Sequence, residues 1–425
     1  MSASLALYRA AAGALEPLAP LVLKRRARLG KEDPARLAER LGRAGRPRPP
    51  GPLAWLHGAS VGESLSLLPL VEAIRAARPD LSLLVTSGTV TSAELLAMRL
   101  PEGVIHQFVP VDAPGAAGRF VGHWRPELAV FVESELWPNL LTAARAQGCA
   151  TALVSARLSQ ASLAGWGRAR GAARALLSGF DLVMAQEDDT AERLASLGAR
   201  DDGRLNLKLI GAALPVDEAA LAAIRAAAGG RPILIAASTH PGEEALALDA
   251  FTGLATLPQR PLLVIVPRHP ARGAEVQDAA RAAGFAVRRQ GAGEVFDPEA
   301  PVYVADALGQ LGQWFAAAAS VFVGGSLVPG IGGHNPLEPA RAGAPIVSGA
   351  AVSNWGGVYA ALVEADAVEI VTGAPSLAGA FAADLSDPAA ARARAERART
   401  VAESGAGALE AALPKLLALA PENRP

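Results

Sequence analysis

Short apolar runs alternate with alanine-rich helical stretches along most of the chain. Strands that alternate with helices form parallel sheets that are covered on both faces. We therefore predict an α/β protein with strands at 53–56, 82–86, 104–109, 128–132, 150–154 and 181–185 in the first half, and at 232–237, 262–266, 285–289, 301–305, 320–325, 345–348 and 368–371 in the second.

The alternation breaks once, near residues 214–232, where a predicted helix ends at Gly229–Gly230 and Pro232 opens the next strand. A chain of 425 residues is also too long for one ordinary core. We expect two doubly wound domains, 49–215 and 216–425, that face a central cleft and follow an N-terminal segment, 1–48. In such sheets ligands bind beyond the carboxyl ends of the strands.

The N-terminal segment is apolar over 4–23 and basic over 24–31. Residues 24–48 hold ten Lys or Arg against three Asp or Glu, and such a cluster attracts anionic lipid by about 1 kcal/mol per basic residue. Charged and proline residues within 4–23 make a poor spanning helix, and no cleavage site of a secretory signal follows. The pattern favours membrane association over the alternative, an ordinary first helix with a solvated basic end.

Charge and composition exclude several classes of function. The formal net charge is −1, so no basic field indicates nucleic acid as a partner. The single cysteine, Cys149, excludes an internal disulfide and suits a reducing compartment. The six histidines show no H-x-x-x-H or H-E-x-x-H spacing, and no D-x-D triplet occurs, so we predict no metal. Dinucleotide and P-loop motifs are absent as well, so no cofactor is predicted.

Polar residues, glycines and prolines follow seven of the predicted strands directly. Glycine and proline are ordinary in loops, but the carboxylates, histidines and Arg268 at these positions are not explained by loops alone. The stretches are "HGASVGE" (57–63), "SGTVTSAE" (87–94), "ESELWPNL" (133–140), "SARLS" (155–159), "STHPGEE" (238–244), "PRHP" (267–270) and "GGSLVPGIGGHNPLEPA" (324–340).

In the first half, the question is whether Glu63 caps a helix or acts as a catalyst. Transfer to an alcohol needs an ionised carboxylate near the hydroxyl that it deprotonates. A helix N-terminus would keep Glu63 ionised and weaken it as a base, so some burial must offset that effect. Glu133, Trp137 and Asn139 could line a sugar pocket, although packing is the commoner role of a tryptophan. Lys208 could neutralise a departing phosphate, and its alternative is a solvated surface lysine.

In the second half, residues 324–340 leave a strand and enter a helix with Pro336 in its first turn, an arrangement that favours a phosphate. Glu338 could bind two ribose hydroxyls, but its spacing from Asn335 also fits a capping box. Arg268 could hold a phosphate through two N–H groups, or form a surface salt bridge. Glu243 and Glu244 are adequately explained as helix-start residues.

Taken in this order, these seven stretches closely resemble the 3-deoxy-D-manno-octulosonic acid (Kdo) transferases of lipid A assembly, from about residue 50 to 375. The resemblance implies a GT-B fold, CMP-Kdo as donor and the tetraacyl lipid A precursor (lipid IVA) as acceptor. It also implies inversion at the anomeric carbon and a place in lipopolysaccharide biosynthesis at the cytoplasmic face of the bacterial inner membrane, with membrane lipids as partners.

By the same resemblance, Glu63 matches the general base, and Glu133 and Lys208 match positions that stabilise the transition state. The implied CMP contacts are Pro267, Arg268, Leu308, Gly309, Gln310, Asn335, Pro336, Leu337 and Glu338. The chain departs from the family in two places. Gln310 stands where Glu is usual, and "LNLKLIG" (205–211) replaces a pattern close to G-N-L-K-[FY]-D.

Two rival interpretations remain at this stage. Another GT-B enzyme that uses a UDP-sugar would bind UDP in preference to CMP. A non-catalytic membrane scaffold would keep its cellular function after Glu63→Ala.

Overall fold

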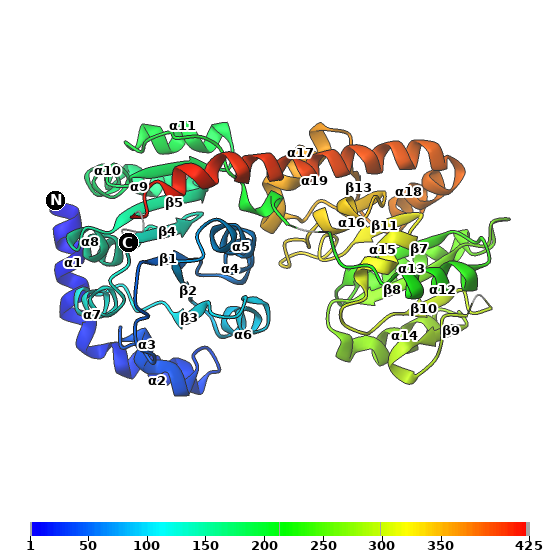
Figure 1. Cartoon of the computed structure of the whole chain (residues 1–425). Coiled ribbons are helices and arrows are strands. Elements are labelled where there is room, and N and C mark those ends of the chain that lie inside the picture. The colour runs from blue at the N-terminus through cyan, green and yellow to red at the C-terminus, as the bar shows by residue number, and fades with distance from the viewer. Residues whose placement is uncertain (1, 212, 298, 422–425) are drawn as a thin grey trace. The chain divides into compact units, whose positions relative to one another are not determined.

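The computed structural model describes residues 2–211, 213–297 and 299–421. The chain divides into two compact units (Figure 1). The first unit contains residues up to Ile210 together with those from Gly405 onward, and the second unit runs from Gly211 to Ser404. All thirteen predicted strands are present and every strand pairing is parallel, which confirms the predicted α/β class.

The first unit is built on a six-stranded sheet in the order β3-β2-β1-β4-β5-β6. Its strands are β1 (Leu53–His57), β2 (Ser82–Ser87), β3 (Ile105–Phe108), β4 (Leu128–Val132), β5 (Ala150–Ala156) and β6 (Leu182–Ala185). The helices between them are α4 (Val61–Ser66), α5 (Leu68–Ala77), α6 (Val90–Arg99), α7 (Pro114–Trp124), α8 (Pro138–Ala146), α9 (Gln160–Gly167) and α10 (Arg170–Leu177), and α11 (Asp188–Ser196) follows β6.

Both faces of this sheet are buried. Along β1, Leu53 and Trp55 pack into one apolar cluster while Ala54 and Leu56 pack into another, as the alternation of side chains along a strand requires. All four residues are 0% exposed, which explains why the strand reads as a continuous apolar run.

The second unit is built on a seven-stranded sheet in the order β13-β12-β11-β7-β8-β10-β9. Its strands are β7 (Ile233–Thr239), β8 (Leu262–Pro267), β9 (Val287–Arg289), β10 (Val302–Val304), β11 (Ser320–Val323), β12 (Ile346–Gly349) and β13 (Glu369–Val371). The helices are α12 (Glu218–Ala228), α13 (Glu243–Leu254), α14 (Gly273–Ala282), α15 (Leu311–Ala317), α16 (Leu337–Arg341), α17 (Gly356–Glu364), α18 (Ala374–Ser386) and α19 (Pro388–Leu417).

The end of the chain departs from the expected boundary of the second domain. Helix α19 starts in the second unit, but residues from Gly405 onward belong to the first. Ala412, Leu416 and Ala420 are 2–6% exposed and pack into the cluster that contains Leu56 and Val130. The apolar surface of the first sheet is thus completed by the C-terminal residues.

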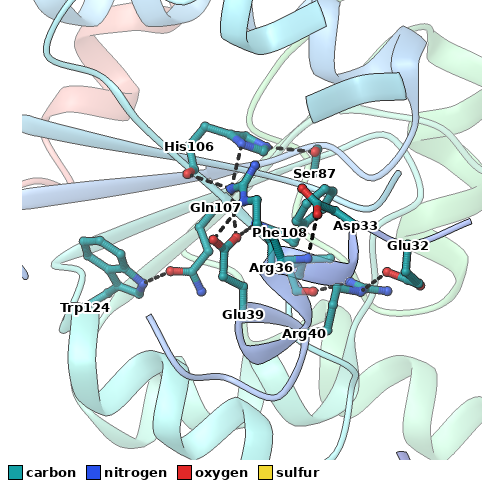
Figure 2. Close-up of polar contacts among 12 residues, drawn as sticks. Glu32, Asp33, Arg36, Glu39, Arg40, Ser87, His106, Gln107, Phe108 and Trp124 are labelled. Carbon is teal, nitrogen blue, oxygen red and sulfur yellow. Dashed lines mark hydrogen bonds and ion pairs between the residues drawn. The ribbon is translucent and has the colours of Figure 1, made fainter. Parts of the chain in front are cut away.

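The N-terminal segment contains α1 (Ala3–Leu15), α2 (Ala19–Arg28) and α3 (Leu37–Arg40). The second half of this segment is bonded into the first unit (Figure 2). Glu39 accepts a hydrogen bond from the Phe108 backbone N–H (2.8 Å) and pairs with Arg36 (2.8 Å). Glu32, which is 4% exposed, pairs with Arg26 (2.8 Å) and Arg40 (3.1 Å). Within the described residues, no helix is long and apolar enough to cross a membrane.

The placement of the C-terminal residues gives a stability prediction. We expect Leu416→Ala to destabilise the first unit by about 2–5 kcal/mol, because it leaves a cavity in a packed core. Glu410→Ala, an exposed change on the same helix, is the control and should stay within about 0.5 kcal/mol of the unaltered protein. Urea unfolding measures both, and equal stability of the two variants would contradict the assignment of this segment to the core.

Candidate active site

The loop after β1 places Glu63 in a capping box. Ser60 is the N-cap of α4, and its Oγ accepts a hydrogen bond from the Glu63 backbone N–H (3.3 Å). In return, Glu63 Oε2 accepts from the backbone N–H groups of Ala59 (2.7 Å) and Ser60 (3.1 Å). A Cβ at Gly58 would lie 2.9 Å from the Glu63 carbonyl carbon, so only glycine permits this close turn. Glu63 is therefore a cap, and its carboxylate is held in a fixed orientation.

The environment of Glu63 also changes its acidity. Burial raises the pKa of Glu63, and the negative charges of Glu135 and Glu133 raise it further. The hydrogen bonds from Ser60 oppose this rise but do not reverse it. The carboxylate is thus a stronger base than a solvated glutamate, while it remains partly exposed.

Two of the predicted residues, Glu133 and Lys208, form an ion pair. Lys208 Nζ lies 2.7 Å from Glu133 Oε1, and Glu133 is 9% exposed at the end of β4. Asn206 Oδ1 accepts a hydrogen bond from the Lys208 backbone N–H (3.1 Å) and closes a short turn. Leu205, which replaces the glycine of the family pattern, is 1% exposed and packs in the core. The altered motif therefore still directs Lys208 to a carboxylate.

Sequence reasoning assigned no role to the neighbouring Glu135 and His57. His57 is 0% exposed, and its Nε2 lies 3.3 Å from Glu135 Oε2 while its Nδ1 lies 2.9 Å from Thr86 Oγ1. Trp137 Nε1 also donates to Glu135 Oε2. Burial opposes ionisation of Glu135, but the hydrogen bonds with His57 and Trp137 lower its pKa overall. The position of Glu135 after β4, two residues before a tryptophan, was the available signal.

In the second unit, Glu243 fixes the glycine-rich loop after β11. It is 0% exposed, and its two carboxylate oxygens accept four backbone hydrogen bonds. One comes from His240 (3.0 Å) at the start of its own helix, as the sequence indicated. The other three come from Gly325 (2.7 Å), Ser326 (3.0 Å) and Leu327 (3.0 Å), more than 80 residues away in sequence. Glu243 thus fixes the shape of the loop that leads to the predicted nucleotide residues.

The predicted residues 335–338 adopt a different helix start from the one that a capping box requires. The N-cap of α16 is Pro336 and has no side-chain cap hydrogen bond. Asn335 Oδ1 accepts from the Leu337 backbone N–H (3.0 Å), and Asn335 Nδ2 donates to Glu338 Oε1 (3.3 Å). The helix begins one residue too late for the Asn335–Glu338 capping box.

The other predicted donor contacts lie at the ends of β8 and β10. Pro267 is buried and ends β8, and the next residue, Arg268, is exposed. Leu308 is 81% exposed and Gly309 has a φ of 80°. Gln310 Oε1 accepts a hydrogen bond from Gln290 Nε2 (2.8 Å). In the part of the chain that the structure describes, no group of three or more His, Cys, Asp or Glu residues is arranged to hold a metal ion.

The fold has a clear structural relative. A solved glycosyltransferase from Rickettsia africae superposes with a TM-score of 0.58 at 11% identity, over 87% of this chain and 99% of that one. With the two parallel-sheet domains described above, this confirms the predicted fold class, that of GT-B glycosyltransferases.

Sequence relatives define the family. The family profile described as "3-Deoxy-D-manno-octulosonic-acid transferase (kdotransferase)" matches residues 35–209. The 3-deoxy-D-manno-octulosonic acid transferase of Bordetella pertussis is 36% identical over 95% of this chain and 97% of its own length. A probable mitochondrial 3-deoxy-D-manno-octulosonic acid transferase of Arabidopsis thaliana is 32% identical over 89% and 87%. The chain belongs to the Kdo transferase family.

The bonding of Glu243 gives a local prediction. In Glu243→Gln an amide NH₂ replaces one acceptor oxygen and leaves buried backbone donors without a partner. We expect the loop at 325–327 to open more easily by about 2 kcal/mol, so its amides should exchange about 30-fold faster. Hydrogen exchange followed by mass spectrometry measures this.

The control is Glu275→Gln, which removes an exposed charge from the same unit and should leave exchange at 325–327 unchanged. Equal protection in Glu243→Gln and the unaltered protein would show that the buried carboxylate does not hold the loop.

Proposed function

We propose that the protein transfers Kdo from CMP-Kdo to a hydroxyl of lipid IVA, with inversion at the anomeric carbon, in lipopolysaccharide biosynthesis. Family membership supports the transferred sugar, and the geometry of Glu63 is the observation that carries the mechanism. One of its carboxylate oxygens, Oε2, is fixed by two backbone N–H groups. Neither of these N–H groups bonds to the other oxygen, Oε1.

This asymmetry suits a general base. The acceptor hydroxyl oxygen attacks the anomeric carbon and passes its proton to Oε1 of Glu63, while the bond from that carbon to the CMP phosphate oxygen breaks. CMP leaves with the bonding electron pair, and attack from the opposite side inverts the carbon. The raised pKa of Glu63 favours proton transfer to it. Glu133 keeps the Lys208 ammonium oriented, so that Lys208 can stabilise charge in the transition state.

We assign the donor to the second unit. Arg268 is exposed and free to contact a phosphate through its guanidinium. Pro267, Leu308–Gln310 and Asn335–Glu338 would complete the CMP contacts. The phosphate of CMP carries less charge than a nucleoside diphosphate, which suits recognition by side chains and backbone N–H groups.

The base role of Glu63 can be separated from its capping role. We expect Glu63→Gln to lower the transfer rate about 10²–10⁴-fold, because the amide can still cap the helix but cannot accept the proton. Mass spectrometry of products from purified protein, CMP-Kdo and lipid IVA measures the rate and shows how many Kdo units are added. CMP binding by the variant should be unchanged.

Ser60→Ala is the matched control, since it removes the capping hydroxyl and keeps the carboxylate. It should retain most of the rate. A Glu63→Gln variant with the unaltered rate would remove Glu63 from the base role, and transfer from a UDP-sugar instead of CMP-Kdo would overturn the donor assignment.

We also propose that the N-terminal segment binds the cytoplasmic face of the bacterial inner membrane. Of the twelve large apolar side chains that are exposed in the described residues, seven lie between residues 7 and 29. They include Leu7 (72%), Leu21 (67%) and Leu29 (64%). Residues 24–48 contain ten basic residues. Four of them form ion pairs with described residues: Arg26, Arg36, Arg40 and Arg48. The remaining basic side chains are suited to anionic headgroups beside this apolar surface.

Vesicle binding tests this second assignment. We expect Leu21→Asp to weaken co-sedimentation with vesicles that contain phosphatidylglycerol by about tenfold or more, because burial of one leucine contributes about 1.5–3 kcal/mol. Met98→Asp, at a side chain that is 73% exposed on α6, is the control and should bind like the unaltered protein. Equal losses in both variants, or none in either, would contradict a specific role of the N-terminal segment.

A further inference from the structure

Two histidines of the second unit, from loops that are far apart in sequence, form one hydrogen bond with each other. His240 follows β7 and His334 lies in the loop after β11. Their Nε2 atoms are 2.8 Å apart, and the rings lie nearly parallel, with 5.0 Å between centroids and 8° between planes. At this distance one Nε2 carries a hydrogen and the other offers its lone pair. The pair thus contains a single Nε2 proton, and the described residues provide no hydrogen-bond partner for either Nδ1.

The position of His334 is fixed by the loop that Glu243 holds. Gly333 N–H donates to Gly325 O (2.8 Å), and a Cβ at Gly325 would lie 2.9 Å from His334 Cδ2. Gly325 in turn donates its backbone N–H to Glu243. The imidazole of His334 is therefore positioned by backbone contacts within the loop that Glu243 holds.

Charged and titratable groups surround the pair unevenly. On the β8 side are Arg268 and His269, and the His269 ring centroid is 6.1 Å from that of His240. On the α13 side are Glu243 and Glu244. Glu243 is occupied by four backbone N–H groups, and Glu244 is held by Thr239 (2.9 Å) and Arg272 (2.6 Å).

Burial and the charge of Arg268 lower the pKa of His334 to about 4, and burial likewise lowers the pKa of His240. The pair is thus neutral at pH 7 while no anion is bound. A bound anion would act in the opposite direction, since a negative charge beside an imidazole favours its protonated form.

We propose that the neutral His240–His334 pair takes up one proton from solvent when a phosphate group binds beside Arg268. The proton adds to the bare Nδ1 of the ring whose Nε2–H donates. The resulting imidazolium keeps its Nε2–H···Nε2 bond and points a new N–H at the phosphate oxygen. The pair then supplies a second cation beside Arg268. The inference deepens the proposed function, since it rests on CMP binding in the second unit.

Calorimetric titration of the full chain with CMP tests the proposal. Titrations at pH 7 in buffers of different ionisation enthalpy report the number of protons taken up. We expect net uptake in the unaltered protein, and tighter CMP binding at pH 6.5 than at pH 8. In His334→Gln the uptake should fall, and CMP affinity at pH 6.5 should drop by about tenfold, with little change at pH 8.

The second pair variant and a distant control make the outcome specific. His240→Gln should behave like His334→Gln, and the double variant should lose no more than either, because the two rings act as one unit. His123→Gln, in the first unit, should match the unaltered protein. Comparison between variants also cancels the titration of the CMP phosphate itself, whose second pKa is about 6.

Proton uptake that persists in folded His334→Gln and His240→Gln would overturn the proposal. If CMP does not bind the unaltered protein at any pH, the donor assignment fails instead. Inorganic phosphate then replaces CMP in the same titrations. Uptake that depends on the pair would sustain the paired-imidazole site, and its absence would overturn that site as well.

Discussion

Backbone N–H groups at the carboxyl ends of parallel strands need acceptors, and in this protein two glutamates, the partly exposed Glu63 and the buried Glu243, provide them. Glu63 accepts two such bonds after β1, and Glu243 accepts four from the loops after β7 and β11. Each carboxylate fixes a turn that would otherwise have several conformations available. The geometry of each candidate site depends on this bonding, because Glu63 lies on the first of these turns and Asn335–Glu338 follow the loop that Glu243 holds.

The two units differ in which charged side chains surround these turns and in how those side chains are paired. In the first, three carboxylates lie close enough to affect one another, and each has a distinct partner. Lys208 pairs with Glu133, His57 and Trp137 hold Glu135, and Glu63 accepts its two backbone hydrogen bonds at one oxygen, Oε2. In the second, Glu243 is bonded to backbone N–H groups and Glu244 pairs with Arg272, whereas Arg268 is exposed. These two environments support the proposed base for a hydroxyl and the proposed site for a phosphate.

The sequence predicted much of the fold and part of the site. Most strands are buried and appear in the sequence as short apolar runs, and the partly exposed edge strands β9 and β13 were predicted from the alternation of strands with helices. The packing partner of α19 could not be predicted, because its apolar residues show that the helix packs but not against which sheet. The ion pair of Glu133 with Lys208 joins residues 75 positions apart, and the family resemblance marked both without showing their contact. Glu243 was seen as a local helix-start residue, while its bonds to 325–327 depend on the pairing of β7 with β11. The spacing of residues in the sequence does not predict the contact between His240 and His334.

The account depends most directly on the acidity of Glu63, where hydrogen bonds from the backbone favour the charged form and burial with two neighbouring carboxylates disfavours it. Carbon-13 NMR of protein labelled at glutamate side-chain carboxyls, with Glu63→Gln to assign the resonance, measures the midpoint of its titration. The account predicts a midpoint above the value of about 4.3 for a solvated glutamate. A midpoint at or below that value would contradict it.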